Sequence, residues 1–279
     1  MNPQPIITLL TDFGLSDAYV GTMKGVILSS CPHVHLIDLT HAIQPQNIRQ
    51  AAYVLLTAFR HFPPHTVFLV VVDPGVGTER APIAVSTNYG IYVAPNNGVL
   101  SYILPHVQVL HTALIQNPDY LPPSSSHTFH GRDIFSPAAA HLANGVPISE
   151  LGPAVPELVK LSDPQLDIHP NRIVGQVLHI DHFGNIITSI GILTWQSTGS
   201  LQLSPQFGSH EPVEISASTS RVRIGTELIH SIRPTYGTVE PGSRVVLVGS
   251  SGQLEIGINQ GHAARSLDVK LDDPVTLDF

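Results

Sequence analysis

The sequence predicts an α/β domain followed by a smaller antiparallel β domain. In the first part of the chain, short apolar runs alternate with segments of helical periodicity, which is typical of a largely parallel sheet covered by helices on both faces. Beyond about residue 155, short apolar runs are separated by turn residues, which is typical of an antiparallel sandwich or barrel. With 279 residues, the chain is long enough for two domains of ordinary size.

The first domain opens with strands and helices in alternation. We expect a strand, a helix, a strand, a helix and a strand at residues 5–11, 17–29, 33–39, 47–60 and 66–72. Ser16 and Asp17 are placed to cap the first helix, in which Val20, Met23 and Ile27 share one face. The last of these strands, TVFLVVV, is apolar throughout and is therefore expected to be buried on both faces.

The remainder of the chain divides into further elements and a linker. Two short strands are expected near 82–87 and 90–94, and a helix between Pro137 and Gly145. We expect the domains to span 1–158 and 173–279, with a proline-rich linker at 159–172. Strands of the second domain are expected at 173–180, 185–190, 200–204, 212–216, 221–230, 244–249, 253–258 and 275–279.

The composition narrows the possible partners and locations. Charged residues make up 12% of the chain, against about 25% in typical proteins, which favours an oligomer that buries part of its surface. The net charge is −8 without any Lys or Arg run, so we expect no nucleic-acid partner. Cys31 is the only cysteine, which excludes an internal disulfide and fits the cytoplasm. The N-terminal sequence MNPQPIITLL has no signal-peptide pattern, and no apolar stretch is long enough to cross a membrane.

Polar clusters follow the strands of the first domain. They are Asp12 in TDFGLSD, Asp73 and Arg80 in DPGVGTER, and His127, His130, Arg132 and Asp133 in HTFHGRD. Because ligands of open α/β sheets bind beyond the carboxyl ends of the strands, Asp12 and Asp73 are expected to face one crevice. Asp, Arg and His together form an acid/base set with a charge stabiliser, so the clusters predict a catalytic site.

Each cluster also has other interpretations. Asp12 and the DPG sequence could serve only to form turns, and His130 could be a buried core histidine. A metal site is a further hypothesis, with His127, His130 and Asp133 as ligands and with Asp12 and Asp73 nearby. The DPGVGTER segment lacks the third glycine of a dinucleotide fingerprint and the Gly-Lys-Ser/Thr of a phosphate loop.

The second domain offers two candidate segments, HIDHFGNIIT at 179–188 and VGSSGQLEIGINQGHAA at 248–264. Asp181, Phe183 and Asn185 provide an acid, an aromatic face and an amide. An amide can pair with the edge of a purine, and an aromatic ring can stack on its face. The alternative is a β-turn at residues 182–185, in which Asn and Gly serve only the turn geometry.

Six motifs together resemble one known family. TDFGLSDAYVGTMKG, DPGVGTER, APNNG, FHGRDIFSPAAAHLA, IDHFGNIITSI and SSGQLEIGINQGHAA occur in order over nearly the whole chain. They resemble the S-adenosylmethionine hydroxide adenosyltransferases, which are hydrolases related to the fluorinases and chlorinases. The resemblance implies a Rossmann-like α/β sandwich domain, a smaller C-terminal antiparallel β-barrel-like domain, and a homotrimer with ligand sites between subunits.

The resemblance also implies an activity. Members of the family convert S-adenosyl-L-methionine and water into adenosine and L-methionine, without a metal or a cofactor. The catalytic residues of the family fall on Asp73, Arg80 and His130, and the sequence leaves open whether Asp73 or His130 accepts the proton. Two alternatives remain open: a metal-dependent hydrolase that uses the His127, His130 and Asp133 cluster, and a non-catalytic protein that binds S-adenosylmethionine or adenosine.

The same resemblance implies the substrate contacts. Asp12 corresponds to the acid that holds the ribose hydroxyls. Where the halogenases carry an arginine after the position of Ser250, this sequence has Ser251. The adenine is expected at Phe183, Asn185 and Tyr236, and the methionine end at Asp181, Ser250 and Glu255.

Overall fold

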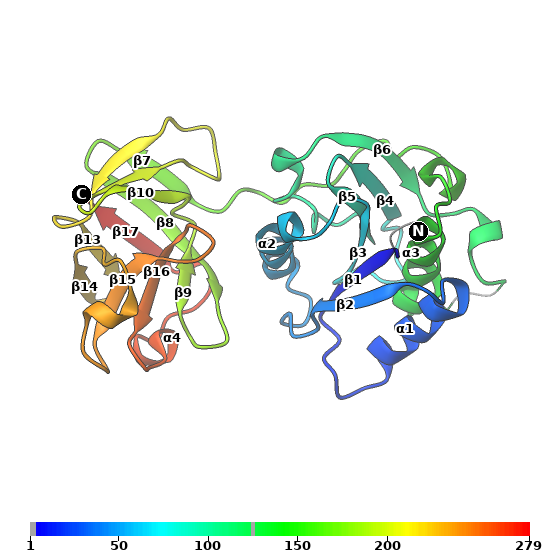
Figure 1. The fold of residues 1–279 in the computed structure, drawn as a ribbon, viewed down its shortest axis with the longest axis horizontal. Helices are drawn as coiled ribbons and strands as arrows, with labels where there is room; N and C mark the ends of the chain where they lie inside the picture. Colours follow the sequence, from blue (N-terminus) through cyan, green and yellow to red (C-terminus); the bar gives the residue numbers. More distant parts are fainter. Residues whose placement is uncertain (1–3, 124–125) are drawn as a thin grey trace. The chain divides into compact units, whose positions relative to one another are not determined.

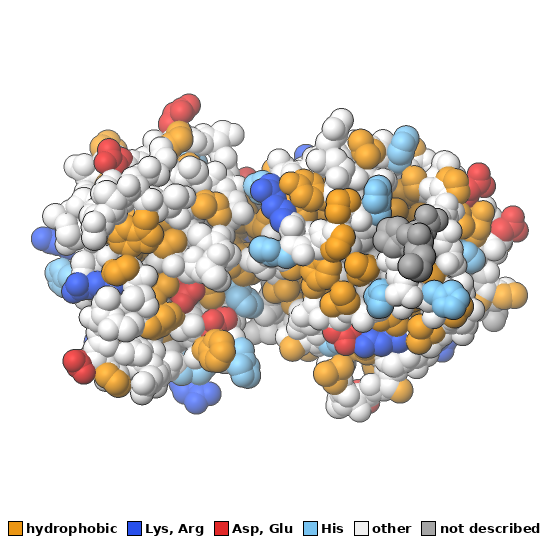
Figure 2. Space-filling view, viewed as in Figure 1, with side chains coloured by type: hydrophobic (Ala, Val, Ile, Leu, Met, Phe, Trp, Pro, Cys, Tyr) orange, Lys and Arg blue, Asp and Glu red, His pale blue; other side chains and the backbone are white. Residues whose placement is uncertain are grey.

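The chain forms two compact units. The computed structural model describes residues 4–123 and 126–279, and the units are Met1–Leu161 and Ser162–Phe279 (Figure 1). The expectation about a signal peptide falls partly on residues 1–3, which lie outside the described residues. In the described part of the chain, no helix is long and apolar enough to cross a membrane. On the face drawn in Figure 2, charged side chains are scattered and form no extended patch of one sign.

The first unit is built on one six-stranded sheet with the order β2-β1-β3-β5-β4-β6. Strands β2, β1, β3 and β5 are parallel to one another, whereas β4 is antiparallel to both of its neighbours. The predicted α/β architecture is therefore confirmed. The strands are β1 (Ile6–Thr11), β2 (His35–Thr40), β3 (Thr66–Val71), β4 (Pro82–Thr87), β5 (Gly90–Pro95) and β6 (Val109–Leu114).

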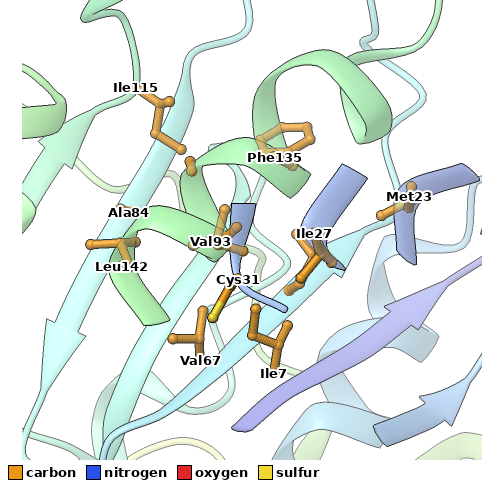
Figure 3. Packing of buried hydrophobic residues seen from close by; sticks show 14 of the residues in the cluster. Ile7, Met23, Ile27, Cys31, Val67, Ala84, Val93, Ile115, Phe135 and Leu142 are labelled. Carbon is orange, nitrogen blue, oxygen red and sulfur yellow. The ribbon is translucent and has the colours of Figure 1, made fainter. Parts of the chain in front are cut away.

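Helices cover both faces of this sheet. Helices α1 (Tyr19–Ser30) and α3 (Ser136–Ala143) pack on each other over one face, and α2 (Ile48–Ala58) lies over the opposite face (Figure 1). In the core under α1 and α3, Ile7 and Val67 of the sheet meet Met23 and Ile27 of α1 and Phe135 (Figure 3). Every residue of β3 is buried, as the uniform apolar sequence predicts for a strand covered on both faces.

The helix ends differ in part from the prediction. Ser16 and Asp17 do not cap α1, because the N-cap residue is Ala18 and no side chain makes a capping hydrogen bond. Helix α2 has a side-chain cap, in which Asn47 accepts a hydrogen bond from the backbone N–H of Gln50. Helix α3 follows a π-helical turn over Gly131–Phe135, which carries the chain from the HTFHGRD segment into the core.

The second unit is an antiparallel, nearly closed barrel with a small additional sheet. The main sheet has the order β14-β13-β17-β8-β9-β16-β15, with β7 paired to β8, and the small sheet has the order β10-β11-β12. The predicted strand at 221–230 is a hairpin of two strands that turns at Gly225. The strands are β7 (Leu166–His169), β8 (Arg172–Ile180), β9 (Ile186–Thr188), β10 (Leu193–Ser197), β11 (Ser200–Leu203), β12 (Val213–Ser216), β13 (Arg221–Ile224), β14 (Glu227–His230), β15 (Arg244–Val248), β16 (Leu254–Ile258) and β17 (Pro274–Asp278).

Candidate active site

Asp73 and Arg80 form a buried ion pair beyond the carboxyl end of β3. Arg80 Nε donates to Asp73 Oδ1 at 2.9 Å, and Arg80 Nη2 donates to Asp73 Oδ2. The side chains of Asp73 and Arg80 are only 6% and 7% exposed. Two parallel hydrogen bonds fix the plane of the carboxylate relative to the guanidinium, so the pair is rigid as well as strong.

The glycine turn between them makes this pairing possible. The N–H of Val76 donates to the carbonyl of Asp73, and the N–H of Thr78 donates to the carbonyl of Gly75, which folds the chain back on itself. Gly77 has a φ of 77° and lies so close to His127 that a Cβ would be 2.6 Å from the His127 carbonyl oxygen. Only glycine fits this position without strain. The turn therefore returns Arg80 to the end of the strand that carries Asp73.

His130 completes a three-residue cluster with this pair. Its Nδ1 atom lies 3.0 Å from Arg80 Nη2. Because a guanidinium can only donate, Nδ1 accepts the hydrogen bond and the proton of the neutral ring is on Nε2. Burial, and then the positive charge of Arg80, lower the pKa of His130 below its ordinary value, although Asp73 opposes the shift. His130 is therefore uncharged at neutral pH.

An aromatic cavity adjoins the cluster. It has a volume of about 150 Å³. The rings of Phe13, Tyr19 and Phe129 form one wall and contact each other with centroid distances between 5.1 and 5.9 Å. Asp73 and His130 present the polar side of the cavity. The cavity thus combines an apolar wall with a carboxylate and an imidazole at one point, as small-molecule sites do.

Asp12 lies at the same edge of the sheet. It directly follows Thr11, which pairs with Val71 in the parallel register of β1 and β3. Its Oδ2 atom accepts a hydrogen bond of 2.7 Å from the backbone N–H of Gln46. The carboxylate is therefore held by the segment that follows β2, and each of its oxygens keeps a further lone pair for a ligand.

The Asp133 carboxylate is engaged by other groups of the first unit. Arg132 donates to its two oxygens at 2.6 and 2.8 Å, and the N–H of Ser126 donates to Oδ2 at 2.7 Å. The hydrogen bond from Arg132 is the main reason that the pKa of Asp133 is lowered. Among residues 4–123 and 126–279, no group of three or more His, Cys, Asp or Glu side chains is arranged to hold a metal ion. The His127, His130 and Asp133 hypothesis thus lacks its ligand geometry in this part of the chain.

In the second unit, Asp181 forms the turn that presents Phe183 and Asn185. Asp181 Oδ1 accepts from the backbone N–H groups of Phe183 at 2.9 Å and Asn185 at 2.8 Å, and Oδ2 accepts from the Asn185 amide at 2.9 Å. The Phe183 ring is left 72% exposed. Both the turn hypothesis and the binding hypothesis are compatible with this arrangement, because the turn leaves the Phe183 ring exposed and holds the half-buried Asn185 amide at Asp181.

Tyr236 and Glu255 form a partly buried pair in this unit. The Tyr236 hydroxyl donates to Glu255 Oε1 at 2.5 Å. Burial raises the pKa of Glu255, and the negative charge of Asp181 adds to the shift. Burial and then the hydrogen bond to Glu255 raise the pKa of Tyr236. Two carboxylates, Asp181 and Glu255, therefore act on each other here, and a cation placed beside them would relieve their repulsion.

A second cavity, of about 480 Å³, brings the expected adenine residues together. Gly184 packs against one wall so closely that a Cβ would be 2.1 Å from His262 Nδ1. The flat ring of Phe183 and the amide of Asn185 lie in the same lining as the ring of Tyr236. The lining residues are Phe183, Asn185, Tyr236, Ile258, Asn259, Gln260, Gly261 and His262.

The predicted site residues thus fall into two groups, one in each unit. The first group is Asp73, Arg80 and His130, with Asp12 at the same sheet edge. The second group is Asp181, Phe183, Asn185, Tyr236 and Glu255. Ser250 is exposed in the turn between β15 and β16, and it lines neither of these two cavities.

Several residues around these cavities were not predicted from the sequence. Phe13, Tyr19 and Phe129 line the first cavity, although polar residues alone defined the predicted clusters. The aromatic residues lie within the same motifs, TDFGLSDAY and HTFHGRD, and that proximity was the available signal. His262 and Gln260 also lie within a motif, SSGQLEIGINQGHAA, but only the fold places them in the same cavity lining as Phe183.

Models of one protein family match both units. The N-terminal domain of the SAM hydroxide adenosyltransferases matches residues 7–152, and the C-terminal domain of the same family matches residues 175–276. The two matches leave out only short segments at the ends and between the units.

Known proteins are similar over nearly the whole chain. A protein from Salinispora tropica named (R)-S-adenosyl-L-methionine hydrolase is 37% identical, with 98% of this chain and 97% of that protein covered. A protein from Actinopolyspora mzabensis named fluorinase is 29% identical, with 96% and 95% covered. The crystal structure of a conserved protein from Thermotoga maritima has a TM-score of 0.86 and 36% identity, with 98% of this chain and 100% of that chain covered.

Proposed function

The chain belongs to the SAM hydroxide adenosyltransferase family, and we propose that it hydrolyses S-adenosyl-L-methionine to adenosine and L-methionine. Water attacks the 5′ carbon of the ribose, and the bond from that carbon to sulfur breaks with its electron pair going to sulfur. One proton of the water passes to a base. The main support for the proposal is that Asp73 and His130 both contact Arg80 beside a cavity at the carboxyl edge of the sheet.

The chemistry of the substrate decides what the protein must supply. The sulfonium becomes a neutral thioether when it leaves, so the leaving group needs no general acid. Water is the weaker reactant, because it must lie in line with the carbon–sulfur bond and lose a proton. Positioning and base assistance are therefore the main tasks of the residues at the cavity.

We assign the base role to Asp73 and a positioning role to His130. His130 accepts from Arg80 through Nδ1, so its Nε2 atom carries a proton and can donate to the oxygen of the water. Asp73 is held by Arg80, yet each carboxylate oxygen keeps a second lone pair with which it can accept from the water. Base assistance of this kind is typically worth about 100- to 10,000-fold in rate, or roughly 3–5 kcal/mol.

Arg80 is suited to stabilise the hydroxide character that develops on the water. Its guanidinium is always charged, and its Nη1 atom is buried without a hydrogen-bond partner in the described part of the chain. Its charge also lies 5.2 Å from the centre of the Phe135 ring, which holds the group in place from the core side. A preorganised cation of this kind costs no rearrangement during the reaction.

We propose that the substrate contacts divide between the two groups of residues. Asp12 binds the ribose hydroxyls, because a carboxylate can accept two hydrogen bonds from a diol. Phe183, Asn185 and Tyr236 bind the adenine, which the cavity that they line supports. Asp181, Ser250 and Glu255 bind the methionine end. The raised pKa of Glu255 beside Asp181 supports a cation such as the methionine ammonium at this place.

We further propose a homotrimer in the cytoplasm, with each site completed by a neighbouring subunit. Leu15 in the first unit and Phe183 in the second are 75% and 72% exposed, and each supports an apolar contact with another chain. The low charged content of 12% agrees with such a buried surface. The single cysteine supports a reducing compartment.

Isotopic labelling of the water tests the reaction directly. The protein is incubated with S-adenosylmethionine in ¹⁸O-labelled water, and the products are analysed by mass spectrometry. We expect the label in the 5′ hydroxyl of adenosine and none in methionine. Label elsewhere, or unlabelled adenosine, would show that water does not attack the 5′ carbon and would overturn the proposal.

A further inference from the structure

His41 connects the Asp12 turn to a charged pair at the edge of the sheet. Its side chain is only 2% exposed, and its Nε2 atom lies 3.0 Å from Asp38 Oδ1. Its Nδ1 atom lies 2.8 Å from Thr11 Oγ1. On the far side, Lys24 donates to Asp38 Oδ2 at 2.7 Å. The buried imidazole thus connects Thr11 of β1, the residue before Asp12, to Asp38 of β2.

The contacts of His41 lead from Asp38 to the turn at Asp12. Although burial raises the pKa of Asp38, Lys24 and His41 bring it below its ordinary value, so Asp38 is a carboxylate and can only accept. Nε2 of His41 faces this carboxylate without a well-directed hydrogen bond among the described residues, whereas Nδ1 shares a hydrogen bond with the hydroxyl of Thr11. Thr11 Oγ1 also accepts from the backbone N–H of Phe13 at 3.2 Å. The contacts thus run from Asp38 through His41 and Thr11 to Phe13.

These contacts hold the backbone on both sides of Asp12. Thr11 precedes it, and Phe13 follows it. The carbonyl of His41 also accepts from the N–H of Gly14 at 2.8 Å. The carboxylate of Asp12 itself accepts from the N–H of Gln46, five residues after His41. The segment 41–46 therefore fixes both the turn and the direction of its acid.

We propose that His41 is a positioning residue for ribose binding, which it serves by fixing the Thr11–Gly14 turn so that the Asp12 carboxylate meets the ribose hydroxyls. The inference rests on the proposed function, in which Asp12 binds those hydroxyls. His41 touches no substrate in this role. Its removal should therefore change one contact of the substrate and leave the others in place.

Two ligands separate this role from a general structural one. Adenosine carries both ribose hydroxyls, whereas 2′,3′-dideoxyadenosine carries neither. We expect His41→Ala to weaken adenosine binding by about tenfold, the usual worth of a hydrogen bond that depends on good geometry, and to leave the affinity for dideoxyadenosine unchanged. The affinities are measured by calorimetry with the full-length protein. An equal loss for both ligands, or no loss for adenosine, would overturn the inference.

Further variants keep the test independent of the stability of His41→Ala. His41→Asn keeps a hydrogen-bonding group where Nδ1 meets the hydroxyl of Thr11, so it should restore most of the adenosine affinity. Thr11→Val removes the hydroxyl at nearly constant volume, and it should repeat the loss of His41→Ala without adding to it in the double variant. Full additivity, or a His41→Asn protein as weak as His41→Ala, would contradict the connection through Thr11.

Two controls separate failure of this inference from failure of the proposed function. His35→Asn changes an exposed histidine on the same strand, β2, and should change neither affinity. Asp12→Ala should lose the preference for adenosine over dideoxyadenosine. If Asp12→Ala keeps that preference, the ribose assignment is wrong and the role of His41 is overturned with it. If Asp12→Ala loses the preference but His41→Ala keeps it, only the role of His41 is overturned.

Discussion

The Asp73 carboxylate contacts Arg80 and also lines the aromatic cavity. It accepts two hydrogen bonds from Arg80, and it faces the cavity whose opposite wall is aromatic. A buried carboxylate without a cation would be costly, and the ion pair with Arg80 offsets the cost of burying Asp73. The pair and His130 act as one unit, and the removal of any member should affect the others.

Replacement of Asp73 tests this unit at its centre. Asp73→Asn keeps the shape of the side chain but removes its charge, and we expect kcat to fall on the order of 100-fold or more. Adenosine should still bind, because the proposed ribose and adenine contacts lie elsewhere. The matched control is Asp119→Asn, which changes an exposed acid in the first unit. Unchanged kcat in Asp73→Asn would remove Asp73 from the reaction.

The environment of His130 predicts the acid limb of the pH profile. Burial and Arg80 lower the pKa of His130 below its ordinary value of 6.5. The neutral ring is therefore present at pH 7 and is lost only as the pH falls through the lowered value. We expect kcat/KM to be level around neutral pH and to decline below pH 6.5, because protonation removes the acceptor for Arg80 and adds a like charge. An acid limb centred above pH 6.5 would contradict this assignment.

The turn at Gly77 is the element that brings Arg80 back to Asp73. A side chain at this position would be strained for two reasons. The φ of 77° is rarely adopted by other residues, and a Cβ would lie 2.6 Å from the carbonyl oxygen of His127. Gly145 provides the matched control, since its φ is 88° but nothing lies within 4 Å of its Cβ position. We expect Gly145→Ala to cost about 1–2 kcal/mol from the backbone alone, and Gly77→Ala to cost more and to lower kcat. Denaturant unfolding and kinetics measure both, and equal costs with unchanged kcat would contradict the account.

The sequence was sufficient for elements that are apolar or clearly periodic. Strand β3 was predicted because a strand buried on both faces is apolar throughout. The buried α1 face of Val20, Met23 and Ile27 was predicted because its apolar residues recur at helical spacing. Strand β6 was missed because its first three residues are exposed at the sheet edge, and the pattern of burial is therefore weak. The short strands β7 and β10 were missed for a similar reason, since pairing with neighbours rather than their own sequence defines them.

The candidate site was predictable to the extent that its residues occur in motifs. Asp73 and Arg80 lie in one motif, and the pairing of the two is local. The contact of His130 with Arg80 joins residues 50 positions apart, and single-sequence patterns do not report such a separation. The role of His41 was not foreseen at all, because its partners Thr11 and Asp38 become neighbours only when β1 and β2 pair.

At the scale of the whole molecule, the exposed apolar side chains predict association. A lone chain would leave the Leu15 side chain of the first unit and the Phe183 side chain of the second exposed to water. We expect light scattering after size-exclusion chromatography to give three times the mass of one chain. Under the trimer proposal, in which a neighbouring subunit completes each site, specific activity should fall on dilution below the range in which the trimer persists. A fully active monomer would contradict the trimer proposal.

Hydrolysis of S-adenosylmethionine by this chain can be measured by chromatography of the reaction products. The purified protein is incubated with S-adenosylmethionine without added halide, once with a chelator and once without it. We expect adenosine and methionine in equal amounts, at a rate that the chelator does not change. Absence of both products, or their loss when the chelator is added, would contradict the proposed function.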